Sequence, residues 1–150
     1  MNIYAELIKR NFKNENILID EFIPKLNSSA ILKKKINKLR FGKYISYPFQ
    51  IKNLNYDLYH VIDHGYSHLI RKLDPNKTVI TVHDLMTLKV RSHEIKGLNY
   101  SHYPLLLHYS LSYLKKAKHI ICVSKNTKKD LIKFLKIDER KISIIYNPVR

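Results

Sequence analysis

The segment TVITVHDL at residues 78–85 constrains the fold more than any other part of the sequence. Its continuous apolar character is typical of a strand in a parallel sheet that is covered on both faces. Further strands are predicted at residues 56–63, 119–124 and 141–149, which are short and rich in tyrosine or β-branched residues. The segments between these strands are long enough to form helices, which indicates a chain of alternating strands and helices.

The helical segments support this alternation. Residues 101–118 predict a long helix, and Ser124 is placed to cap the helix that follows it. The order of elements favours a doubly wound, Rossmann-like α/β fold with a mostly parallel sheet, and 150 residues suit a single domain. The other predicted elements are helices at 2–12 and 28–42, strands at 17–24 and 43–49, and an irregular polar loop at 86–100.

Polar residues follow three of the predicted strands. Asp63, His64 and Gly65 end the first, His83 and Asp84 end the second, and Ser124 ends the third. In open α/β sheets, ligands bind beyond the carboxyl ends of the strands. These residues are therefore the first candidates for a functional site.

Three segments resemble motifs of one enzyme family. YDLYHVIDHG (56–65) is similar to a strand and loop that read roughly D-x-h-H-x-H-x, and VITVHDL (79–85) is similar to VVTVHDL. The most specific segment is KKAKHIICVSKNTKKDLIKFLKIDERKISIIYNPV (115–149), in which a helix end, a strand, a capping serine, a helix and a closing strand recur in order. Together they resemble the amino-terminal, acceptor-side domain of family 4 glycosyltransferases, which have the GT-B fold of two facing Rossmann-like domains.

This resemblance implies transfer of a hexose from a nucleotide-diphosphate sugar to a glycan or a lipid-linked acceptor. In the family the second domain holds the donor, so we expect this chain to bind no cofactor by itself and to need a second polypeptide with a donor-binding domain. Family members open with a strand and a glycine-rich loop, whereas here Met1 leads into a helix and the chain has three glycines. Pro148 stands where the family usually has glycine, just before Arg150. We therefore expect residues 1–150 to be a partial GT-B half.

His83 is the residue that the resemblance places beside the transferred sugar, as the catalytic candidate. A neutral imidazole there could bind a sugar hydroxyl, and the carboxylate of Asp84 could orient the ring. The structural alternative is that His83 satisfies nearby backbone carbonyls at the end of its strand, and that Asp84 caps the following turn. Both interpretations are open at this point.

Asp63, His64 and Gly65 are the candidates for holding the acceptor. Gly65 could let the backbone approach a ligand closely, and His64 could contact that ligand. The alternative is a turn in which Asp63 is a local cap and Gly65 has a positive φ. Ser124 could face the donor phosphate from a helix N-terminus, although an ordinary helix cap is the simpler explanation.

Two other chemistries are disfavoured. His60 and His68 lie near His64, but the eight histidines and one cysteine show no metal-ligand spacing, so no metal site is expected. A serine hydrolase is disfavoured because the chain has no G-x-S-x-G motif. Cys122 lies inside an apolar strand, which predicts a packed core residue rather than a nucleophile.

The formal net charge of +16 allows three interpretations: nucleic-acid binding, attraction to an anionic membrane, or a compositional bias. Nucleic acid is the least favoured, because arginine, which reads bases and clamps phosphates, is scarce. Residues 28–40 form a basic amphipathic segment that suits either peripheral membrane contact or an ordinary solvated surface. With one cysteine and no secretory signal, the chain is expected in the cytoplasm, with the inner membrane face as a further option. A non-catalytic module that binds acidic glycan, anionic lipid or RNA is the alternative function.

Overall fold

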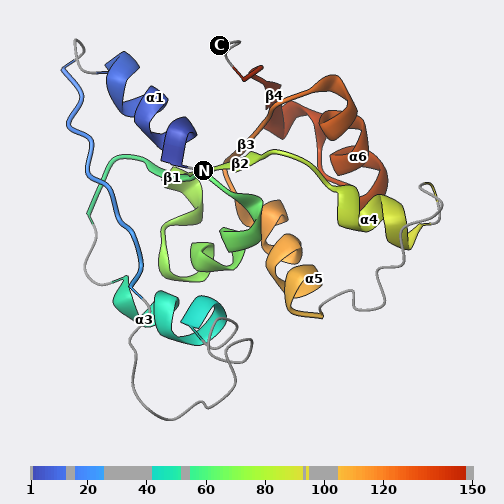
Figure 1. Ribbon diagram of the computed structural model, residues 1–150, viewed down its shortest axis with the longest axis horizontal. Coiled ribbons are helices and arrows are strands. Elements are labelled where there is room, and N and C mark those ends of the chain that lie inside the picture. Colours follow the sequence, from blue (N-terminus) through green and yellow to red (C-terminus); the bar gives the residue numbers. More distant parts are fainter. Residues whose placement is uncertain are drawn as a thin grey trace.

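A computed structural model describes residues 2–12, 16–25, 42–51, 55–92, 94 and 105–147. Figure 1 shows helices packed around one small sheet. The strands are β1 (Tyr59–Val61), β2 (Thr78–Val82), β3 (His119–Cys122) and β4 (Ile142–Ile144). The α-helices are α1 (Asn2–Phe12), α3 (Tyr47–Gln50), α4 (Met86–Arg91), α5 (Leu105–Ser112) and α6 (Lys125–Leu135). Shorter helical turns are the π-type η1 (Gly42–Ser46) and the 3-10 segments η2 (His64–Lys72), η3 (Pro75–Lys77), η4 (Tyr113–Lys116) and η5 (Glu139–Lys141).

The sheet is parallel throughout its described strands and has the order β1-β2-β3-β4. In its register, Ile80 pairs with Val61 on one side and with Ile120 on the other. The predicted parallel α/β architecture is therefore confirmed. Each strand is shorter than the sequence suggested, because the residues at both ends leave the sheet for turns and caps.

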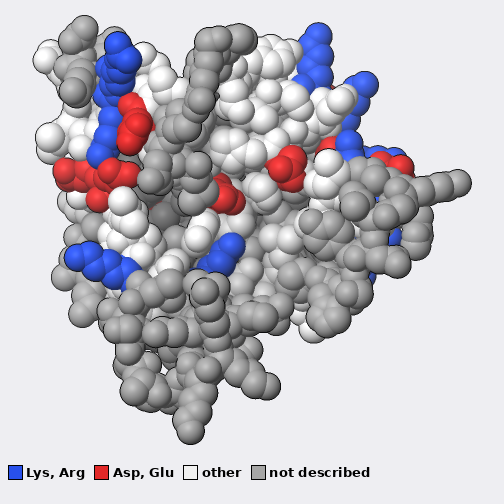
Figure 2. All heavy atoms as spheres, viewed as in Figure 1, with Lys and Arg blue, Asp and Glu red and all other residues white. Residues whose placement is uncertain are grey.

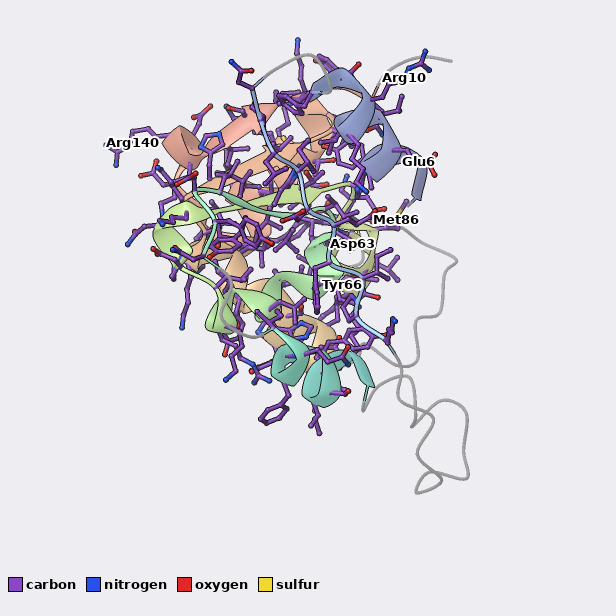
Figure 3. All side chains as sticks on the ribbon, turned by 90° about the vertical axis from the view of Figure 1, so that its left-hand side faces the viewer. Glu6, Arg10, Asp63, Tyr66, Met86 and Arg140 are labelled. Carbon is purple, nitrogen blue, oxygen red and sulfur yellow. The ribbon has the colours of Figure 1, made fainter. Side chains whose placement is uncertain are left out.

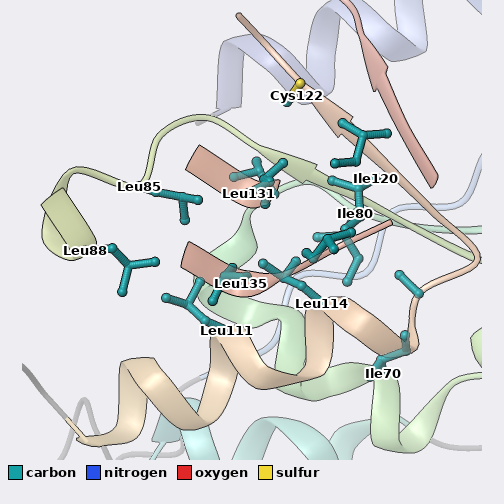
Figure 4. Close-up of a cluster of buried hydrophobic side chains, with 14 residues drawn as sticks. Ile70, Ile80, Leu85, Leu88, Leu111, Leu114, Ile120, Cys122, Leu131 and Leu135 are labelled. Atoms are coloured by element: carbon teal, nitrogen blue, oxygen red, sulfur yellow. The ribbon is translucent and has the colours of Figure 1, made fainter. Parts of the chain in front are cut away.

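The hydrophobic core lies on one face of this sheet. Ile80, Val82, Ile120 and Cys122 point into it from the strands, and all are fully buried. Crossovers between parallel strands are right-handed as a rule, and with the order β1-β2-β3-β4 this rule predicts that the connecting segments pack on the same face. The connecting segments supply most of the other core side chains, which Figure 4 shows: Ile70, Leu85, Leu88, Leu111, Leu114, Leu131 and Leu135.

The opposite face of the sheet carries Thr81, because side chains alternate along a strand. Helix α1 covers this residue: the Tyr4 hydroxyl lies 3.2 Å from Thr81 Oγ1. The helix predicted at 2–12 is confirmed. Its packing brings Tyr4 to the carboxyl end of the strands.

Helix α6 forms where the sequence predicted it. Ser124 caps it, since Ser124 Oγ accepts a hydrogen bond from the Thr127 N–H at 3.0 Å. Leu131 and Leu135, four residues apart, bury one face of the helix. The helix ends at Lys136, which has a left-handed conformation with φ 52°.

Two predicted strands are wrong. Residues 17–24 form no strand; the segment passes over the surface, where Asp20 accepts a hydrogen bond from the Tyr56 hydroxyl. Residues 43–49 are helical instead of extended. Proline suits the first turn of a helix, and Pro48 occupies such a position in α3. The rings of Tyr44 and Tyr47 in this segment contact His68 and Tyr66 of η2.

The loop predicted at 86–100 is wrong in its first part. Residues Met86–Arg91 form α4, because Leu85 and Leu88, spaced three residues apart, are both buried in the core. Lys89 of α4 forms an ion pair with Asp130 of α6 at 3.0 Å, which joins the two helices. The helix predicted at 28–42 lies mostly outside the described residues.

Candidate functional site

Three segments leave the sheet at one edge, which we call the rim: residues 62–65 after β1, 83–84 after β2, and Ser124 after β3. Parallel strands place their carboxyl ends together, and hydrogen bonds join the segments directly. His83 Nε2 donates to the carbonyl oxygen of Ile62 at 3.0 Å, and Thr127 Oγ1 donates to the carbonyl oxygen of His83 at 3.3 Å. The candidate residues predicted from the strand ends therefore lie together.

His83 is half-buried at the end of β2. Because a carbonyl oxygen only accepts hydrogen bonds, Nε2 must carry a proton, and Nδ1 is then the acceptor nitrogen of the neutral ring. The Tyr4 ring meets the imidazole edge-on, with centroids 5.3 Å apart and planes at 86°. The hydrogen bond to Ile62 agrees with the structural alternative, in which His83 satisfies a backbone carbonyl. The same bond fixes the tautomer of the ring, so a sugar hydroxyl would meet Nδ1 as an acceptor.

Asp84 is exposed and its carboxylate accepts a hydrogen bond from the Met86 N–H at 3.1 Å. It therefore caps the turn into α4. Among the described hydrogen bonds, the one that orients the His83 ring is donated to the Ile62 carbonyl oxygen and does not involve Asp84. A contact between Asp84 and a ligand stays a prediction.

Asp63 is the N-cap of η2, since its Oδ1 accepts a hydrogen bond from the Gly65 N–H at 2.6 Å. The interpretation of Asp63 as a local cap is thus confirmed. Gly65 has no positive φ, and its lack of a side chain serves another purpose. A Cβ at this position would lie 2.9 Å from Lys43 Nζ and 3.1 Å from Asp63 Oδ1. Gly65 therefore makes room for an ammonium group beside the rim.

His64 has an unsatisfied ring nitrogen. Its Nδ1 is buried without a hydrogen-bond partner in the described part of the chain, and lies 3.8 Å from Asp63 Oδ1. Burial lowers the pKa of His64, while the charges of Asp63 and Asp84 oppose this shift. His64 is thus a neutral imidazole with unused hydrogen-bonding capacity. An orphaned buried polar group of this kind is a common mark of a functional site.

Figure 3 shows Asp63, Tyr66 and Met86 on the same side of the molecule, between α1 and α3. Tyr66 follows Gly65 in η2, and its ring stacks on that of Tyr47 with centroids 6.2 Å apart and planes at 19°. Neither tyrosine stands out in the sequence as a candidate site residue. Aromatic rings suit the apolar faces of sugars, but nothing local in the sequence shows that α3 and η2 meet.

His60 and His68, which lie near His64 in the sequence, have structural partners. His60 Nε2 lies 2.7 Å from Thr81 Oγ1, and burial lowers the pKa of this histidine. His68 is fully buried; its Nε2 donates to the Lys43 carbonyl at 2.9 Å, and its Nδ1 lies 3.0 Å from Ser110 Oγ. Within the described residues, no group of three or more His, Cys, Asp or Glu side chains is placed to hold a metal ion.

Ser124 and Cys122 stand near the rim with clear structural roles. The Ser124 hydroxyl is occupied as a helix cap, so its contact with a donor phosphate stays a prediction. Cys122 is fully buried in the core, and burial raises the pKa of its thiol. The prediction of a packed cysteine is confirmed.

The family of the chain follows from a comparison with known proteins. The family model described as Glycosyltransferase Family 4 matches residues 8–150. Neither the curated proteins nor the solved structures include a match. The matched region contains all four strands and every rim residue named above. The chain therefore belongs to glycosyltransferase family 4.

Proposed function

We propose that this chain is the acceptor-side domain of a glycosyltransferase that moves a hexose from a nucleotide-diphosphate sugar to a glycan or a lipid-linked acceptor. The observation that carries the proposal is the rim, where His83, His64 and Asp63 meet at the carboxyl ends of neighbouring strands. Neutral imidazoles and carboxylates are the groups that bind sugar hydroxyls without needing a charged substrate.

Each rim residue has a role in this proposal. His83 Nδ1 accepts a hydrogen bond from a hydroxyl of the transferred sugar, because Nε2 is already committed to Ile62. His64 and the exposed carboxylate of Asp84 bind hydroxyls of the acceptor, and Gly65 lets the acceptor approach the backbone. Asp63 acts mainly by holding the η2 turn in place.

The nucleotide sugar is held by a second Rossmann-like domain that faces the rim, and the α6 N-terminus at Ser124 lies toward the donor phosphates. The transfer uses no metal bound by this chain. Among the described helices none is long and apolar enough to cross a bilayer. A lipid-linked acceptor would be met at the cytoplasmic surface of the membrane, with residues 28–40, which lie outside the described residues, as the contact.

The test is an assay of the chain together with its donor-binding domain, joined to it or added separately. His83→Ala is expected to lower kcat/KM at least 100-fold while the circular dichroism spectrum is unchanged. The matched control is His119→Ala, because His119 begins β3 at the other end of the sheet and bonds to Ser143 Oγ at 2.8 Å. Full activity of folded His83→Ala, or an equal loss in the control, would disprove the role of His83.

A non-catalytic module that binds acidic glycan, anionic lipid or RNA is the second candidate, favoured by the net charge of +16. On the face in Figure 2, however, the described basic and acidic side chains are interspersed and form no continuous basic patch. Binding to such polyanions without turnover of any nucleotide sugar, even with a donor-binding domain present, would favour this candidate.

A further inference from the structure

Lys43 is a half-buried cation held by aromatic rings. Its Nζ lies 4.2 Å from the ring centroid of Tyr66 and 5.7 Å from that of Tyr44. None of the ion pairs between described residues includes Lys43. Its backbone is fixed, because His68 Nε2 donates to the Lys43 carbonyl oxygen. The ammonium group is thus positioned by packing rather than by a bonded carboxylate.

The ammonium group stands at the rim beside the acceptor candidates. Gly65 leaves the space that Nζ occupies, since a Cβ there would be 2.9 Å from it. Asp63 is near enough to raise the pKa of Lys43, but burial has the larger effect and lowers it. The charge of Lys43 also lowers the pKa of His64, so the two groups share one neighbourhood.

A partly desolvated ammonium group is costly unless an anionic oxygen compensates its charge. Neutral sugar hydroxyls can accept its hydrogen bonds but leave the charge uncompensated. The Asp63 carboxylate forms no ion pair with Lys43 among the described residues, so it compensates the ammonium charge only in part and from a distance. The group that would best compensate the charge of the Lys43 ammonium group is an anion that does not belong to the described residues.

We propose that Lys43, with Gly65 and Tyr66, forms an anion subsite that recognises a phosphate or carboxylate group on the acceptor. The proposal rests on the proposed transferase function for the identity of its ligand as an acceptor. It makes Lys43 a specificity-determining residue, which selects anionic acceptors over neutral ones and takes no part in the transfer itself.

The binding test uses the full chain without donor or partner. Inorganic phosphate, glucuronate and neutral glucose are titrated separately, and the amide signals of Gly65 and Tyr66 are followed by NMR. We expect saturable shifts with phosphate or glucuronate and none with glucose at the same concentration. A stronger response to phosphate identifies a phosphorylated acceptor, and a stronger response to glucuronate identifies an acidic sugar.

Variants separate a specific subsite from the general positive charge of the chain. Lys43→Met is expected to weaken anion binding at least tenfold, and Gly65→Ala to weaken it by displacing Nζ. The matched control is Lys116→Met, which removes an equal charge from a lysine that lies 4.9 Å above the Tyr113 ring. Lys116 precedes β3 and so lies at the amino end of the strands, away from the rim. Its loss is expected to change binding less than twofold.

Equal binding by Lys43→Met and the parent chain, or an equal loss in Lys116→Met, would overturn the proposal. Lys43→Arg keeps the charge and is expected to retain measurable binding. This variant keeps the proposal testable if Lys43→Met does not fold. The His64 ring gives a second readout: bound phosphate is expected to raise its pKa in the parent chain and not in Lys43→Met.

Turnover distinguishes the failure of this proposal from the failure of the proposed function. In the assembled enzyme, Lys43→Met is expected to raise KM for an anionic acceptor at least tenfold with kcat changed less than threefold. Unchanged KM with normal turnover would refute the anion subsite and leave the transferase function standing. Loss of phosphate binding in Lys43→Met, in a chain that transfers no sugar, would support the subsite and refute the transferase function.

Discussion

Thr81 Oγ1 lies 2.7 Å from His60 Nε2 and so joins β2 to β1 through side chains as well as through the backbone. Thr81 is fully buried, and the Tyr4 hydroxyl reaches the same oxygen from α1 at 3.2 Å. One hydroxyl therefore connects two strands and a helix just below the rim.

Replacing Thr81 with Val is expected to lower the free energy of unfolding by about 1–3 kcal/mol, because two partly buried polar groups lose their partner. Urea denaturation of Thr81→Val, Tyr4→Phe and the double variant measures this. The double variant is expected to cost less than the sum of the single ones, since both changes break the same contact. Strict additivity would show that the Tyr4 hydroxyl does not bind Thr81.

Leu131 is fully buried on α6, where it packs against the sheet. Leu131→Ala is expected to reduce the free energy of unfolding by about 2–5 kcal/mol, through lost burial and the cavity left behind. The control is Leu105→Ala on α5, because Leu105 is 85% exposed, and it is expected to change stability by less than about 0.5 kcal/mol. Chemical denaturation compares the two variants, and similar costs would contradict the placement of the core.

The buried His68 predicts a dependence of stability on pH. Burial lowers the pKa of His68 from 6.5 to about 4 in the folded chain. Between these values the unfolded chain binds more protons, so stability is complete above pH 6.5 and falls as the pH is lowered to 4. The loss is expected to be on the order of 2–3 kcal/mol from this residue. His60 and His64, whose pKa values are also lowered, act in the same direction.

Urea denaturation at several pH values between 4 and 7 measures this dependence. His68→Gln is expected to flatten the slope even if it is less stable at neutral pH. An unchanged slope in that variant would mean that His68 is not the group that titrates.

Two substitutions of Ser124 separate its role as a helix cap from a role in contacting the donor phosphates. Ser124→Ala is expected to lower the free energy of unfolding by about 1 kcal/mol, and Ser124→Asp to restore most of it, because both Ser and Asp cap helices well. If the hydroxyl also faced the donor phosphates, Ser124→Asp would raise the donor KM far more than Ser124→Ala, by charge repulsion. Equal KM values for the donor in the two variants would mean that Ser124 acts only as a helix cap.

The sequence predicted best where local signals agree with tertiary packing. In α6, the capping Ser124 and the spacing of Leu131 and Leu135 all act within one helix, so the element could be predicted. The rim could be predicted for a different reason. It follows from the parallel strands alone that residues ending them meet at one edge.

Other features depend on contacts between distant residues. The tyrosines and Ile45 of the segment 43–49 suit a strand, but His68 Nε2 and the Arg71 guanidinium donate to its carbonyl groups and hold it in a helical form. Lys43 was missed because its significance comes from Gly65, which lies far along the chain. The unpaired Nδ1 of His64 likewise depends on how η2 folds over the rim.

The strand order β1-β2-β3-β4 has a consequence for biosynthesis. Among the described strands, each is hydrogen-bonded only to those that precede or follow it directly along the chain. This order gives each pair of parallel strands a single crossover connection, and no other strand is inserted between the two in the sequence. The strands can thus pair in the order in which they are synthesised, so β1 and β2 can pair before β4 has left the ribosome.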